Sequence, residues 1–243
     1  MPDKEKIQEM FDSIAPEYDA FNHLTSLGID RTWRKKALKY VRGPKVLDIA
    51  CGTGDFSITI ARHLSRRYGN SPVSGTEDDW SVTGADISAG MLERMREKVA
   101  AAGLEGRVSA ETGDCCDLHY SSGRFDTVTV AFGVRNFEDR AQALQEILRV
   151  LKPGGRFVML ELGVPKGRVT GGIFKFYFTR IMPLVGGKMS RNREAYRYLP
   201  ASVLNFPEPG EWTAFMEKAG FRKVIHRPLT LGICRLYVGE KKG

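Results

Sequence analysis

The sequence predicts an α/β fold: a doubly wound, mainly parallel sheet of seven strands, with an N-terminal helical cap and a lid inserted near the C-terminus. Strand-like and helix-like segments alternate from about residue 45 onward, which is typical of such sheets. A glycine-rich turn follows the first strand-like segment, at the position where open α/β sheets bind ligands. The length of 243 residues fits a single domain over 1–243.

Residues 1–44 precede the alternation and are expected to form the helical cap. Ile7, Met10, Phe11 and Ile14 are spaced as on an amphipathic helix, and the pattern stays helical to about residue 42. Asp30 is a candidate N-cap for the helix RTWRKKALKYV.

Residues 45–162 are expected to form the core of the sheet. Apolar runs predict five strands, at 45–50, 81–87, 107–113, 125–132 and 156–162. Helical periods fill most of the intervals, at 55–67, 88–102 and 138–151. A polar loop at 69–80 separates the first of these helices from the second strand.

Residues 163–205 interrupt the alternation and are expected to form a lid over the substrate. They mix glycine pairs with the apolar stretch IFKFYFTRIMPLV. Residues 206–243 then predict a helix that begins at Pro209 and ends at Gly220, followed by strands at 221–228 and 233–239 joined as a hairpin.

The formal net charge of +8 is concentrated in the lid. Residues 166–197 hold eight basic residues against the single acid Glu194: Lys166, Arg168, Lys175, Arg180, Lys188, Arg191, Arg193 and Arg197. A local basic field of this kind favours an anionic membrane surface, a nucleic acid or an acidic substrate, and a solvated face is the alternative.

The cysteines and the N-terminus favour a reducing compartment. Cys51, Cys115, Cys116 and Cys234 show no C-x-x-C spacing, so we expect free thiols and no metal site. The opening stretch MPDKEKIQEMF has no apolar region, and no stretch approaches the roughly 18 apolar residues of a membrane-spanning helix. We expect a cytoplasmic protein, at most peripheral on the inner face of the membrane.

The turn in DIACGTGDF, residues 48–56, is the strongest local signal. Gly52 and Gly54 let the backbone approach a ligand closely. A dinucleotide fingerprint requires a third glycine, where this chain has Ser57. Asp48, four residues before Gly52, suits a cationic amino group and would repel a pyrophosphate. The pattern D-x-x-x-G-x-G therefore predicts an S-adenosylmethionine site that holds the cofactor's amino-acid end.

Two further acids follow the next two strands. Asp86 closes the second strand, where its carboxylate can accept both ribose hydroxyls. Asp114 follows the third strand and can accept the adenine amino group, while the amide of Cys115 faces a ring nitrogen. We add Thr53 in the turn and Ala131 at the end of the fourth strand to the cofactor-binding set.

Nearly the whole chain resembles the ubiquinone/menaquinone biosynthesis C-methyltransferases. The resemblance rests on FDSIAPEYDAFNHLTSLGIDRTW, LDIACGTGD, VAFGVRNF, RVLKPGGRFVMLEL, FYFTRIMPLVGG and YRYLPASVLNFP. It implies a class I, Rossmann-like methyltransferase that methylates a ring carbon of a prenylated quinol, demethylmenaquinol or its benzoquinol counterpart. The chain departs from the family pattern at Phe21, Thr25, Asp30, Cys51 and Gly163.

The resemblance also implies where the chemistry takes place. GVRN, after the fourth strand, places Arg135 and Asn136 beside the transferred methyl, and Arg135 is the candidate for stabilising a quinol oxyanion. Tyr18 would close over the ring from the cap. His23 is a base by its chemistry alone, but a lone histidine on a cap helix is more often structural.

Several alternatives remain open at this point. Aromatic and aliphatic residues of the lid interleave with Lys175 and Arg180, which favours a membrane interface, a lid helix packed on the core, or both. An RNA-binding module or RNA methyltransferase would also use a basic lid, although no RNA-binding motif is present and we expect no nucleic-acid partner. A nicotinamide oxidoreductase and a non-catalytic scaffold are further alternatives for the function. For the assembly, a homodimer remains open.

Overall fold

The structure is a computed structural model that describes residues 3–69, 79–182 and 193–243. It contains a seven-stranded sheet in the order β3-β2-β1-β4-β5-β7-β6. The strands are β1 Lys45–Ile49, β2 Ser81–Asp86, β3 Val108–Thr112, β4 Phe125–Ala131, β5 Leu151–Leu162, β6 Arg222–Leu229 and β7 Cys234–Glu240. The first five pair in parallel, and β7 runs antiparallel to both β5 and β6. The doubly wound sheet and its C-terminal hairpin are confirmed.

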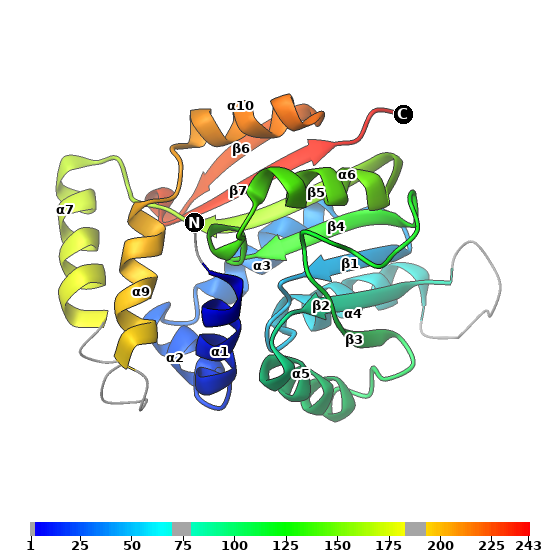
Figure 1. The fold of residues 1–243 in the computed structure, drawn as a ribbon, viewed down its shortest axis with the longest axis horizontal. Coiled ribbons are helices and arrows are strands. Elements are labelled where there is room, and N and C mark those ends of the chain that lie inside the picture. The colour runs from blue at the N-terminus through cyan, green and yellow to red at the C-terminus, as the bar shows by residue number, and fades with distance from the viewer. Residues whose placement is uncertain (1–2, 70–78, 183–192) are drawn as a thin grey trace.

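Helices cover both faces of the sheet (Figure 1). α4 Asp55–Tyr68, α5 Ala89–Ala101 and α3 Asp30–Ala37 contribute to one apolar cluster, and α6 Arg140–Val150 and α10 Pro209–Ala219 contribute to another. Successive residues of β5 alternate between the two clusters: Phe157 and Met159 lie in the second, and Val158 and Leu160 in the first. This period of two places a core on each face of the sheet.

The cap and the insertion pack against each other to form a third cluster. The cap comprises α1 Lys4–Ile14, α2 Tyr18–Thr25, α3 and the short turn η1 Leu38–Tyr40, and the insertion comprises α7 Arg168–Phe176, the π-helical η3 Tyr177–Ile181 and α9 Arg193–Leu204. Figure 1 shows α1, α2, α7 and α9 grouped on one side of the sheet. The apolar cluster that they share with Met91 of α5 is completed by Ile14, Ala15, Phe21, Phe174, Phe178, Met182 and Val203. Of the segment predicted as a helical cap, residues 4–14, 18–25 and 30–40 are helical.

Two local predictions are wrong. Asp30 is the first residue of α3 rather than its N-cap, because its carboxylate accepts hydrogen bonds from Ser26 and Arg34 instead of capping the helix. β5 begins at Leu151, five residues before the predicted start, because Leu151 already pairs with Phe125 before a register shift. The predicted start and end of α10 are confirmed: Pro209 lies in its first turn, and Gly220 closes it in the left-handed conformation.

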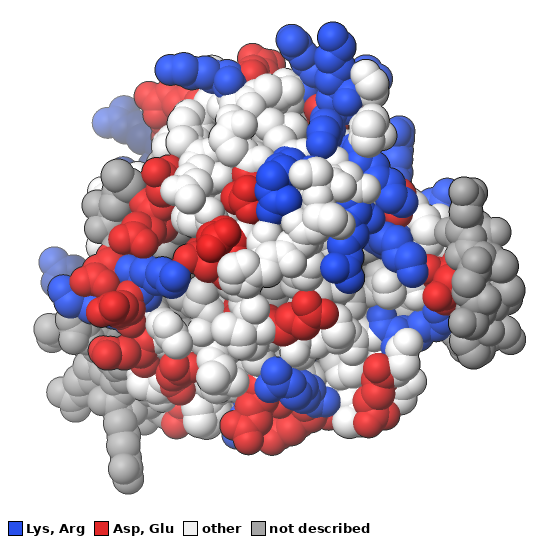
Figure 2. Space-filling model, turned by 45° about the vertical axis from the view of Figure 1, so that its right-hand side comes forward, with Lys and Arg blue, Asp and Glu red and all other residues white. Residues whose placement is uncertain are grey.

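Charge is unevenly distributed over the surface. Figure 2 shows Lys and Arg side chains gathered over the upper right of one face and Asp and Glu side chains on its left and along the bottom. Positive charge is therefore not confined to the insertion, which lies on the left in Figure 1. Lys188 and Arg191 of the predicted basic lid lie outside the described residues. Within the ranges described, no helix combines the length and the apolar character needed to cross a membrane.

Candidate active site

The turn between β1 and α4 needs both of its central glycines. Gly52 and Gly54 have φ values of +55° and +80°, in the left-handed region that glycine adopts without strain. A Cβ on Gly54 would lie 2.5 Å from Cγ of Met95 on α5. Thr53, between them, donates a hydrogen bond of 2.5 Å to Asp19 of α2, so the turn is fastened to the cap.

Asp48 lies beneath this turn and is almost fully buried. Its two carboxylate oxygens accept hydrogen bonds of 2.6 Å from Ser57 Oγ and Thr129 Oγ1. Burial nevertheless raises the pKa of Asp48 to about 6, because the charged form loses more hydration than these bonds replace. Ser57, which stands at the third glycine position of a dinucleotide fingerprint, therefore orients the acid.

Asp86 joins the end of β2 to the turn. Its Oδ2 accepts a 2.8 Å hydrogen bond from the amide of Gly52, and its Oδ1 accepts a 2.9 Å bond from the amide of Ser88. Each oxygen retains acceptor capacity for a further donor. Burial raises the pKa of Asp86 as well.

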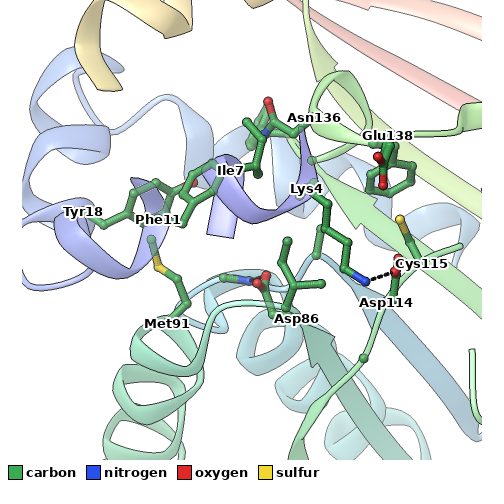
Figure 3. Close-up of a pocket in the computed structure, with 18 residues that line it drawn as sticks. Lys4, Ile7, Phe11, Tyr18, Asp86, Met91, Asp114, Cys115, Asn136 and Glu138 are labelled. Atoms are coloured by element: carbon green, nitrogen blue, oxygen red, sulfur yellow. Dashed lines mark hydrogen bonds and ion pairs between the residues drawn. The ribbon is translucent and has the colours of Figure 1, made fainter. Parts of the chain in front are cut away.

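Asp114 already has a cationic partner from the far end of the chain. Lys4 of α1 donates a 2.5 Å hydrogen bond to its Oδ2, and the amide of Cys116 donates one of 2.9 Å to its Oδ1 (Figure 3). Burial alone would raise the pKa of Asp114, but these hydrogen bonds outweigh it and lower the pKa. In Figure 3, Lys4, Ile7 and Phe11 of α1 face the ends of the strands across the cavity.

A continuous cleft runs along the ends of these strands. One part has an open volume of about 730 Å³ and is lined by Asp86, Asp114, Cys115 and the side of α1 that carries Lys4. The other is smaller and is lined by Asp48, Thr53 and Asp55. Gly52, Ala131, Tyr18 and Phe132 line both parts. The structure thus brings together every predicted cofactor-binding residue except Gly54, which lies behind the turn and caps α4.

A larger cavity opens on the other side of Tyr18 and Phe132. Its open volume is about 1210 Å³, and its walls come from α2, α3, η4 Thr230–Gly232 and the inner face of the insertion. The walls are largely apolar: Leu27, Ile29, Trp33, Leu162, Phe174, Tyr177, Phe178, Met182, Leu199 and Ile233. Asp30, Arg34 and Arg135 are its charged lining residues. Tyr18 lines this cavity and both parts of the cleft, so it lies where the compartments meet.

Phe132, at this junction, has an uncommon backbone conformation. Its φ is +64°, which a bulky residue rarely adopts, and its amide donates a 2.8 Å hydrogen bond to Leu160 of β5. Strain of this kind persists where the surrounding structure over-determines it, and it often marks a functional site.

Arg135 and Asn136 belong to η2 Val134–Asn136, the turn after β4. Arg135 is buried and donates a 2.8 Å hydrogen bond to Glu161 of β5, a fully buried carboxylate, and another to the carbonyl of Phe132. Its Nε is buried without a hydrogen-bond partner among the described residues. Asn136 faces the cleft, and its Oδ1 accepts a 3.0 Å hydrogen bond from Tyr198 of α9. The insertion thus contacts the turn after β4 directly.

Comparison with known proteins identifies the family to which this chain belongs. Residues 2–241 match the family model described as the ubiE/COQ5 methyltransferase family. The chain belongs to the ubiE/COQ5 methyltransferase family.

Relatives and solved structures agree with this membership. The Geobacter sulfurreducens ubiquinone/menaquinone biosynthesis C-methyltransferase UbiE is 45% identical over 240 residues, 98% of this chain and 89% of that protein. The Bacteroides fragilis demethylmenaquinone methyltransferase is 40% identical over 98% of this chain and 93% of its own. A crystal structure of a SAM-dependent methyltransferase from Aquifex aeolicus has a TM-score of 0.57 at 18% identity, covering 85% of this chain and 88% of that chain, and shows the shared fold. This ubiE/COQ5 family member is therefore a methyltransferase.

His23 of this methyltransferase connects two acids of the cap and core. Its Nδ1 lies 3.2 Å from Asp30 and its Nε2 lies 3.6 Å from Asp55. Arg34 and Lys98 also pair with these carboxylates, and their charges outweigh burial and lower the pKa of Asp55. Because the acids are already neutralised by side-chain cations, we assign no metal to this cluster.

Four residues of the site were missed by sequence reasoning: Lys4, Arg34, Phe132 and Glu161. Glu161 carried a usable signal, since an acid inside the apolar run RFVMLEL needs a buried partner. Phe132 lies in the quoted motif VAFGVRNF, but no pattern reveals its conformation. Lys4 and Arg34 lie among other charged residues, where nothing local distinguishes them.

Proposed function

We propose that this methyltransferase adds a methyl group to a ring carbon of a prenylated quinol and converts demethylmenaquinol to menaquinol. The observation that carries this proposal is the large apolar cavity that meets the cofactor cleft at Tyr18 and Phe132. An aromatic ring with a polyprenyl tail needs an apolar compartment of this kind beside the methyl donor. The names of the relatives at 40–45% identity point to the same substrate class.

The cleft residues suit the parts of S-adenosylmethionine. We assign Asp86 to the ribose hydroxyls, since each of its oxygens has capacity for a further donor. Asp48 suits the ammonium group, because a cation would favour the charged form of an acid whose pKa is about 6. Asp114 and the amide of Cys115 suit the adenine edge. For this, Lys4 must either move away from the Asp114 carboxylate or leave one of its oxygens free to accept from the adenine amino group.

Bound S-adenosylmethionine supplies a methyl group on a positively charged sulfur, which leaves as a neutral thioether. The protein's part is to hold the ring carbon in line with that methyl and to favour the quinolate form of the substrate. Arg135 lines the apolar cavity and has an unused Nε donor, which suits it to a quinol oxygen. Glu161 fixes the position of the guanidinium and offsets its charge, so Arg135 acts as an oriented hydrogen-bond donor. The methylated ring carbon then loses its proton to solvent, and the ring becomes aromatic again.

The test is methyl transfer by the purified enzyme. It is given S-adenosylmethionine and either reduced demethylmenaquinone or the matching benzoquinol, and the product is analysed by mass spectrometry. We expect one added methyl on the naphthoquinol ring. Quinones extracted from a host that lacks this protein should be missing the same methyl. A full set of methylated quinones in that host, with neither quinol methylated in vitro, would refute the proposal.

We also propose that the insertion docks on an anionic membrane, where a prenylated quinol resides. Phe174, Phe178 and Met182 face inward and line the apolar cavity. Val169, Ile173 and Phe176 point outward and are 72%, 66% and 63% exposed, a stripe that nothing in the chain covers among the described residues. The exposed cations of the same segment are Arg168, Lys175 and Arg180. An apolar stripe flanked by cations suits a helix that lies in a lipid interface.

A further inference from the structure

The smaller part of the cofactor cleft holds charges of both signs. Its described lining includes two carboxylates, Asp48 and Asp55, and one cation, Arg34. The amino-acid end of S-adenosylmethionine is a zwitterion with one ammonium and one carboxylate. The acids suit the ammonium, and the carboxylate of the ligand requires a cation.

Arg34 reaches this cavity from α3 of the cap, and its side chain is 9% exposed. Its Nη1 donates to Asp30, and its Nη2 lies 3.5 Å from Asp55 Oδ2, a distant ion pair. Its Nε is buried and has no hydrogen-bond partner among the residues that the structure describes. The edge formed by Nε and Nη2 is therefore under-used, and a guanidinium binds a carboxylate with such a two-donor edge.

We propose that Arg34 binds the carboxylate of the cofactor's methionine moiety. This assignment rests on the proposed use of S-adenosylmethionine and adds a residue of α3 to a cofactor site whose other assigned side chains follow strand ends. The amino-acid end of the ligand brings one charge of each sign, so it adds no net charge to the cluster when its carboxylate faces Arg34 and its ammonium faces Asp48. A buried donor without a partner is costly, and the ligand would supply that partner.

The same side chain also lies against the substrate compartment. Arg34 lines the apolar cavity, and its guanidinium carbon lies 5.8 Å from the ring centroid of Phe132 at the junction. Binding of the cofactor's carboxylate to Arg34 would therefore position α3 and, with it, this wall of the apolar cavity. An alternative occupant of the free edge is an oxygen of the quinol itself, and the two assignments make different predictions.

The experiment compares two nucleosides that differ only at the amino-acid end. S-adenosylhomocysteine has the zwitterion, and 5′-methylthioadenosine lacks it. Calorimetry with Arg34→Gln should show S-adenosylhomocysteine weakened on the order of tenfold to a hundredfold, the range expected for a lost charged hydrogen-bond pair. Binding of 5′-methylthioadenosine should change by less than about twofold. Lys35→Gln, an exposed neighbour on the same helix, should bind both ligands like the parent.

Each other outcome has a distinct meaning. Equal weakening of both nucleosides would overturn the proposal, because Arg34 would then only support the cap. Unchanged binding of both with a raised KM for the quinol would assign Arg34 to the substrate instead. If the parent protein binds neither nucleoside, the proposed cofactor itself is wrong. Should Arg34→Gln fail to fold, Arg34→Lys is the decisive variant: it keeps the charge and loses the two-donor edge, and must still weaken S-adenosylhomocysteine selectively.

Discussion

At the residue scale, burial disfavours the charged forms of Asp48 and Asp86 and raises their pKa values. The pKa of Asp48 is about 6, raised from the ordinary value of 3.8 chiefly by burial. An acid with a raised pKa in the folded state binds its proton more tightly there than in the unfolded chain. Its contribution to stability is therefore fully present below about pH 4 and is lost as the pH rises through 6. Near neutral pH the charged Asp48 therefore lowers the stability of the ligand-free protein, and a bound cation would offset this loss by favouring the charged form.

Replacement of Asp48 by Asn should remove that dependence in the ligand-free protein. Between pH 4 and pH 7 the free energy of unfolding of Asp48→Asn should rise relative to the parent by an amount on the order of 3 kcal/mol, since each unit of pKa shift is worth about 1.4 kcal/mol. Urea denaturation of both proteins at several pH values measures this difference. A difference that is the same at every pH would show that Asp48 is not the titrating group.

Arg135 should act on the transition state rather than on cofactor binding. Removing it alone would leave Glu161 buried without its partner, at a cost of about 3–5 kcal/mol in stability. The informative variant is therefore Arg135→Gln combined with Glu161→Gln, which keeps the pair neutral. We expect kcat to fall roughly a hundredfold while the affinity for S-adenosylhomocysteine changes only a few-fold.

Glu161→Gln alone is the matched control for this variant, since it retains the guanidinium but loses the carboxylate that positions it and offsets its charge. We expect the single variant to retain more activity than the double one. Loss of S-adenosylhomocysteine binding with an intact kcat in the double variant would place Arg135 at the cofactor.

At the element scale, the segment formed by α7 and η3 has two apolar faces. Its inner face completes the wall of the apolar cavity, where the rings of Phe174 and Phe178 stack with centroids 4.9 Å apart. Its outer face is exposed, as described above. A helix that only closed a cavity would gain nothing from a second apolar face, so the outer stripe favours contact with a lipid surface.

Changing the outer face should weaken membrane binding and spare the chemistry. Replacing Ile173 and Phe176 with Ser, or Lys175 and Arg180 with Gln, should reduce sedimentation with anionic vesicles at least fivefold. It should also raise the apparent KM for a long-tailed quinol and leave turnover of a short-tailed analogue nearly unchanged.

Arg62 and Arg66 on α4 supply the control, because they are equally exposed but belong to a helix on one face of the sheet, away from the insertion. Their replacement with Gln should leave sedimentation unaltered. Equal losses in both charge variants would indicate general electrostatic attraction, and equal effects on both quinols would make the insertion a lid only.

At the scale of the whole molecule, α1 covers one side of the cleft but does not pack in the cores on the two faces of the sheet. The apolar clusters on the two faces of the sheet contain no residue of α1. α1 is held instead by the third apolar cluster, to which Ile14 belongs, and by polar contacts: Lys4 pairs with Asp114, and Asp12 accepts hydrogen bonds from Ser88 Oγ and the amide of Gly90. A helix that takes no part in the cores on the two faces of the sheet opens more readily than one within them.

Binding of S-adenosylhomocysteine should therefore protect α1 selectively. Hydrogen exchange of the amides in Lys4–Ile14 should slow at least tenfold with saturating ligand, because Ile7 and Phe11 line the occupied cleft. Exchange in α10, which packs on β6 and α6 away from the cleft, serves as the internal reference and should change little. Equal slowing of both helices would indicate global stabilisation and no lid function for α1.

The sheet and most of the residues that line the cleft could be predicted from the sequence. Alternating apolar periods predict strands and helices locally, and parallel strands bring their carboxyl ends to one edge. Asp48, Asp86 and Asp114 could therefore be grouped from their positions after successive strands. Motif resemblance then added Arg135 and Asn136, although not the partners that hold them.

The contacts between distant groups could not be predicted from the sequence. Lys4 reaches Asp114 across 110 residues of chain, and Tyr198 reaches Asn136 across 62. Arg34 enters the cofactor cleft because α3 folds back over the turn after β1, and Glu161 meets Arg135 because β4 and β5 are neighbours in the sheet. Contacts of this kind depend on the packing of whole elements, whereas sequence patterns report the conformation of the segment that carries them.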